Sequence, residues 1–61
     1  MANYNYDITI MGTAGGDLVA RGRYRIKGHD KDRAIAKAVK LFRRDFYDRS
    51  TDQITITTRA K

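Results

Sequence analysis

Polar and apolar residues alternate along three stretches of this chain, and before the third stretch the spacing changes to that of a helix. The most regular alternation runs over residues 18–27 and predicts a β-strand with two chemically different faces. One face carries the apolar residues and a glycine: Leu18, Ala20, Gly22, Tyr24 and Ile26. The other carries Val19 and then a cation at every second position: Arg21, Arg23, Arg25 and Lys27. This row of cations is the strongest functional signal in the sequence.

Two further strands are predicted by the same alternation. Residues 4–11 form the first strand, whose aromatic and β-branched residues face inward: Tyr4, Tyr6, Ile8 and Ile10. Residues 53–58 form the third strand, with Ile54 and Ile56 inward, and residues 59–61 are expected to fray.

The glycine-rich stretch after the first strand predicts a tight hairpin. A two-residue loop at Gly15 and Gly16 would bring Ile10 opposite Arg21 and a cation into the core, so the alternation disfavours it. A three-residue loop ending at Gly16, which is left-handed and lies beside a bulge, pairs Ile10 with Ala20 instead. On the other face this register sets an acid, Asp7, opposite only one of the cations, Arg23. A register two residues away satisfies the same alternation and remains open.

Residues 31–48 show the three- and four-residue spacing of an amphipathic helix. Asp30 is expected to cap it and Asp32 to complement its dipole. The apolar stripe consists of Ile35, Ala38, Val39, Phe42 and Phe46, flanked by Ala34 and Leu41. We expect this stripe to cover the apolar face of the sheet, with Phe42 in the space left by Gly22. A second basic surface is expected on the far side of the helix: Arg33, Lys37, Lys40 and Arg44.

These elements predict an α+β fold, a single small β-β-α-β domain over residues 1–61. The sheet is three-stranded and mainly antiparallel, with one helix on one face and the other face open and basic. The third strand is expected beside the first, in the order second, first, third. A right-handed crossover that places it beside the second strand is the alternative.

Composition and charge limit the classes of protein to which the chain can belong. The chain has 61 residues, a net charge of +6 and no cysteine, so it lacks disulfides and has room for only a small core. We expect a cytoplasmic protein with anionic partners and no membrane association. One histidine, His29, and no identifiable nucleophile with its base predict that the protein is not an enzyme and uses no cofactor or metal.

The cations on the open face of the predicted sheet suggest nucleic acid as a partner. Its cations form the Arg21, Arg23, Arg25 and Lys27 row, extended by Arg59 from the third strand. Guanidinium groups bind phosphates with paired hydrogen bonds and read guanine edges. The tyrosines of the sheet fall on the core face, so a stacking platform for single strands is missing. We therefore predict a non-enzymatic module for duplex or backbone-tracking binding, and a merely solvated basic face is the simplest alternative.

A protein partner is the rival hypothesis. The same cations suit an acidic protein surface, as in a small adaptor or inhibitor of the kind that phages encode. The third strand is an edge without charge or proline over residues 53–58. We expect this edge to offer a pairing site to a partner strand or to a second copy in a homodimer.

Overall fold

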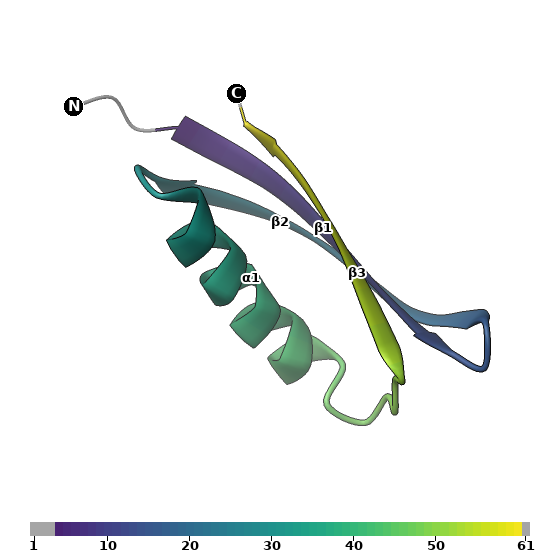
Figure 1. Cartoon of the computed structure of the whole chain (residues 1–61). Helices are drawn as coiled ribbons and strands as arrows, with labels where there is room; N and C mark the ends of the chain where they lie inside the picture. The colour runs from purple at the N-terminus through teal and green to yellow at the C-terminus, as the bar shows by residue number, and fades with distance from the viewer. Residues whose placement is uncertain (1–3, 61) are drawn as a thin grey trace.

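The computed structural model describes residues 4–60 and contains one sheet and one helix (Figure 1). The elements are β1 (Tyr4–Ala14), β2 (Asp17–Gly28), α1 (Lys31–Asp45) and β3 (Gln53–Ala60). The strands lie in the order β2-β1-β3, and β1 is antiparallel to both neighbours. The predicted α+β class and strand order are therefore confirmed, and the crossover that would place the third strand beside the second is absent from the described residues.

The third strand is longer than predicted. Arg59 and Ala60 continue β3 and pair with β1, so the expectation that they fray is wrong. Lys61, the last residue of that expectation, lies outside the described residues. Because Arg59 belongs to the sheet, its place on one face is set by the strand alternation.

The hairpin between β1 and β2 differs from the prediction. Gly15 and Gly16 form a two-residue turn with φ angles of 60° and 87°, and Ala14 pairs with Asp17 directly across it. Two positive φ angles are typical of the type I′ turn, whose twist matches that of the flanking strands. The predicted three-residue loop is wrong.

A β-bulge reconciles this short turn with the strand alternation. Thr13 pairs with Leu18, but Gly12 pairs with Ala20, so Val19 is an extra residue in β2. Its insertion turns Leu18 away from the predicted core face, and 56% of Leu18 is exposed. Beyond the bulge the register is the open alternative two residues from the predicted one, with these core-face pairs: Ile10–Gly22, Ile8–Tyr24 and Tyr6–Ile26.

The helix begins as predicted and ends three residues early. The Asp30 carboxylate accepts a hydrogen bond from the Asp32 amide at 2.9 Å, which caps the first turn. At the other end the backbone leaves the helical conformation at Phe46, whose amide still donates to the Phe42 carbonyl. Residues 46–48 therefore form turns, so the predicted extension of the helix to residue 48 is wrong.

The core lies between α1 and the first two strands. Its buried hydrophobic residues are Tyr6, Ile8, Ile10, Ala20, Ile26, Ala34, Ala38 and Phe42. The helix contributes two alanines and one phenylalanine to this set, whereas the larger residues of the predicted stripe are only partly buried. Small side chains at the contact let the helix lie close to the strands. The helix packs on β1 and β2, so the inward residues of β3 stay partly exposed.

The prediction that Phe42 lies in the space at Gly22 is wrong. A Cβ at Gly22 would lie 2.6–2.9 Å from the hydroxyl oxygen and ring atoms of Tyr24, so Tyr24 and not Phe42 fills the space at Gly22. Phe42 instead lies over Gly12, where a Cβ would be 3.5 Å from its Cζ and 2.7 Å from Cγ2 of Thr51. The missing side chain of Gly12 therefore leaves room for Thr51, with Phe42 packed beside it.

Tyr24 also joins β2 to the end of the helix. Its hydroxyl donates a hydrogen bond of 2.9 Å to Oδ2 of Asp45. Loss of solvation, followed by this bond to a carboxylate, raises the pKa of Tyr24 from 10.0 to about 12. The folded protein thus holds the phenol in its neutral, donating form.

Stability at high pH tests this contact. The raised pKa means that the contribution of Tyr24 is complete below pH 10 and is lost as the pH rises toward 12. In urea unfolding, the advantage of the wild type over Tyr24→Phe should be constant below pH 10 and then shrink. An advantage that stays constant through pH 12 would contradict the proposed role of the Asp45 bond.

Candidate nucleic-acid interface

The sheet face opposite α1 holds the predicted row of cations. Arg21, Arg23, Arg25 and Lys27 are exposed and alternate along β2. Their partners directly across on β1 are, in the same order, Met11, Thr9, Asp7 and Asn5. On the other side of β1, strand β3 contributes Thr55, Thr57 and Arg59. We call these residues of the three strands the open face.

Asp7 is the acid of the open face, and it faces arginine on both sides. Arg25 is its partner on β2 and Arg59 its partner on β3, whereas the predicted register paired it with Arg23. Nε of Arg25 donates to Oδ1 of Asp7 at 3.1 Å, and only 8% of Asp7 is exposed. Arg23 lies across from the uncharged Thr9 instead. The correction follows from the two-residue turn and the bulge, each of which moves the pairs by one residue.

A shallow hollow of about 360 Å³ runs across the open face. Cations from both outer strands, hydroxyl groups and one carboxylate line it: Asp7, Thr9, Arg21, Arg23, Thr57, Thr58 and Arg59. Guanidinium groups donate paired hydrogen bonds to phosphate oxygens, and threonine hydroxyls commonly add further bonds to them. The hollow therefore offers the donor types that a phosphate backbone requires.

Aromatic side chains of the strands lie away from the open face. Tyr6 is buried in the core, its neighbour Tyr4 lies 6.2 Å from it ring to ring, and Tyr24 packs against the helix side. Within residues 4–60, the strand positions of the open face carry no ring on which a base could stack. The arrangement suits contacts to phosphates better than contacts to unpaired bases.

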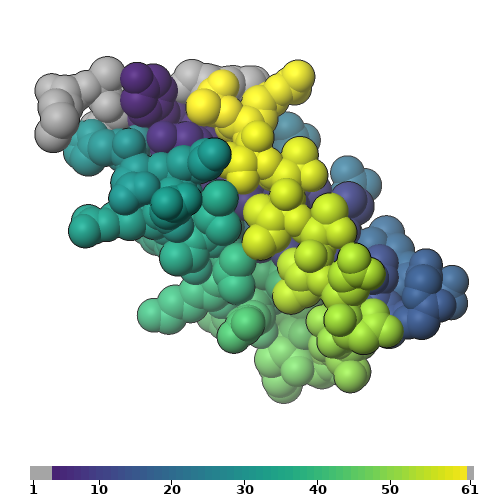
Figure 2. All heavy atoms as spheres, viewed as in Figure 1, coloured from purple at the N-terminus to yellow at the C-terminus, as the bar shows by residue number. Residues whose placement is uncertain are grey.

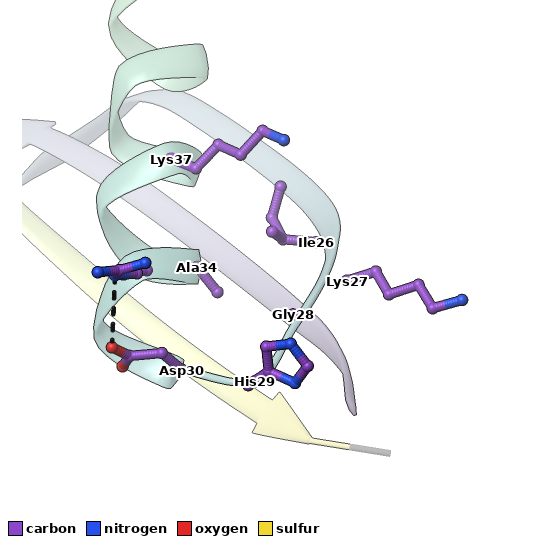
Figure 3. A pocket seen from close by; sticks show the side chains of 8 residues that line it. Ile26, Lys27, Gly28, His29, Asp30, Ala34 and Lys37 are labelled. Carbon is purple, nitrogen blue, oxygen red and sulfur yellow. Dashed lines mark ion pairs between the residues drawn. The ribbon is translucent and has the colours of Figure 1, made fainter. Parts of the chain in front are cut away.

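Part of the second basic surface lies nearer to β2 than predicted. Arg33 and Lys37 line a hollow of about 240 Å³ together with Lys27 and His29, between the end of β2 and the start of α1 (Figure 3). Nε of Arg33 is 3.8 Å from Oδ2 of Asp30, and its side chain is largely exposed. Lys27 therefore makes the cations of the open face continuous with those of the helix around the β2 edge.

This continuity was missed by the sequence argument. Helical spacing grouped four cations on one side: Arg33, Lys37, Lys40 and Arg44. It could not show that the helix packs over β1 and β2, which turns Arg33 and Lys37 toward the β2 edge. The edge position of β2 in the predicted strand order was the signal that could have joined the two surfaces.

A metal-holding cluster and a membrane-spanning helix are absent from the described part of the chain. No group of three His, Asp, Glu or Cys residues there is placed to hold a metal ion. None of its helices has the length and apolar character needed to cross a membrane. Compared with protein-family models, curated proteins and solved structures, the chain matches none of them. The geometry of the open face is therefore the basis on which a function can be proposed.

Removing the Asp7 charge tests whether the open face attracts anions. Asp7→Asn leaves Arg25 and Arg59 without their facing carboxylate, so the variant should elute from a heparin column at higher salt than the wild type. Its stability should fall by about 1–3 kcal/mol, because a buried acceptor loses its charge. The control Asp48→Asn removes the same charge from an exposed turn, and an equal shift in both variants would contradict a local effect.

Proposed function

We propose that this protein is a non-enzymatic module that binds the phosphate backbone of duplex nucleic acid through its open face. The observation that carries the proposal is the regular row of exposed arginines on β2, continued across β1 by Arg59. Alternate residues of a strand lie about 6.6–6.8 Å apart. The protein therefore presents charge at repeated intervals along an extended line, as a phosphate chain does.

The width of the sheet favours binding to the phosphate backbone of a duplex over contacts to base edges in a groove. Three strands at about 4.8 Å spacing place the outer strands about 10 Å apart before side chains are added. The major groove is about 12 Å wide and admits a two-stranded ribbon. A three-stranded face with arginines on both outer strands therefore suits contacts to the phosphates on both sides of a groove rather than insertion into the groove.

An acidic protein surface is the second candidate partner. It is favoured by Leu18, which the bulge leaves 56% exposed at the hairpin end of the sheet. Protein interfaces commonly combine apolar anchors with a charged rim, whereas phosphate contacts need no apolar anchor. The protein would then be an adaptor or inhibitor that uses the same cations.

A salt series on a triple variant separates these partners. Arg21→Gln, Arg23→Gln and Arg25→Gln together remove three charges, which should weaken binding to all duplex sequences alike. If each arginine contacts one phosphate, the slope of log affinity against log salt should fall by about 2.7. Circular dichroism should show that the variant remains folded, because the three side chains are exposed and glutamine at position 25 can still donate a hydrogen bond to Asp7.

The matched control removes the same charge elsewhere. Lys40, Arg43 and Arg49 are exposed and lie outside the open face, so their triple replacement by Gln should leave most of the slope intact. Equal loss in both triples would mean that net charge alone drives binding. A wild type without affinity for duplex nucleic acid would contradict the proposal and favour the acidic protein partner.

A further inference from the structure

On the core side of the sheet, the side chains of β3 are only partly covered by the rest of the protein. Its Ile56 pairs with the fully buried Ile10, and its Ile54 pairs with the buried Gly12. Both isoleucines nevertheless remain exposed, at 38% for Ile54 and 39% for Ile56. The helix packs on the other two strands, and β3 forms the surface beside it (Figure 2).

A hollow of about 440 Å³ joins the end of α1 to β3. Phe42, Phe46 and Ile54 line it, and so do Arg43 and Arg49. Ile35 and Val39 of the helix are also only partly buried. We call this hollow, with Ile56, the β3–α1 groove. It is the kind of surface that a small protein buries against a partner.

The outer edge of β3 is open to strand pairing. Residues 53–58 contain neither charge nor proline, which are the usual features that protect an edge. The opposite edge of the sheet, β2, is different because a cation stands at every second position from Arg21 to Lys27. A second copy with the same positive charge would be repelled more strongly at β2 than along the uncharged residues 53–58 of β3.

We propose that a second copy of this chain binds at β3, with the two β3 strands antiparallel about a twofold axis at Ile56. Pairing Ile56 with its own counterpart keeps the isoleucines of both copies on the same face as the helices. The two β3–α1 grooves then join side by side over the paired β3 strands. Such an interface is isologous, so one surface serves both copies.

The cross-strand pairs of β3 support this occupant. Antiparallel pairing about Ile56 sets Thr55 of one copy opposite Thr57 of the other, and Arg59 opposite the uncharged Gln53. No like charges therefore face each other along the paired strands, and threonine pairs are of a kind that stabilises antiparallel sheets. The pairing also joins the two open faces into one six-stranded surface, with the β2 rows at its outer edges.

Sedimentation in the absence of nucleic acid tests the second copy independently of the proposed function. The wild type should be dimeric at high micromolar concentration, and Ile56→Lys should weaken the dimer at least about 10-fold by placing like charges together. The control Leu18→Lys makes the same replacement at an exposed residue outside the groove and should remain dimeric. A monomeric wild type, or an Ile56→Lys variant as dimeric as the control, would overturn the proposal.

Cysteine crosslinking tests the twofold axis. The chain has no cysteine, so Ile56→Cys introduces a single thiol. Residues paired across antiparallel strands lie about 4.5–5.5 Å apart, within reach of a disulfide. Ile56→Cys should therefore form a covalent dimer under mild oxidation much faster than Leu18→Cys. Equal rates for the two variants would overturn pairing at Ile56.

Discussion

The close contact of one helix with two strands determines how the rest of this molecule is arranged. A helix with its side chains is about 10–12 Å across, and strands lie about 4.8 Å apart, so one helix covers two strands and not three. Ala34 and Ala38 bring α1 close to the sheet, and Phe42 is seated over Gly12. The core is therefore centred on β1 and β2, and β3 joins the sheet without a layer above it.

Because the helix covers β1 and β2 but not β3, the two edges of the sheet differ in chemistry. At the β2 edge, arginines on the open face continue through Lys27 to Lys37 on the helix, so positive charge surrounds the strand. At the β3 edge, Ile54 and Ile56 border a strand without charge over residues 53–58. A polyanion on the open face and a second copy at the β3 edge would thus occupy different surfaces.

The sequence was informative where alternation is continuous and misleading where a single residue interrupts it. The two faces of the sheet, the strand order and the Asp30 cap all followed from local patterns. The register did not, because Leu18 and Val19 are both apolar and hide the bulge between them. The exposure of Ile56 could not be predicted either, since alternation assigns a face to a residue but not the width of the layer that covers it. The open-face arginines could be predicted because strand alternation alone places them on the face opposite the core.

The central claim is that the open face is where nucleic acid binds, and chemical-shift mapping of the isotope-labelled protein during titration with duplex DNA tests it most directly. The account predicts that the largest shifts occur at Arg21, Arg23, Arg25 and Arg59, including the side-chain Nε–H groups, while the amides of Val39 change little. Shifts concentrated on the helix flank at Val39, or no shifts at all, would contradict the account.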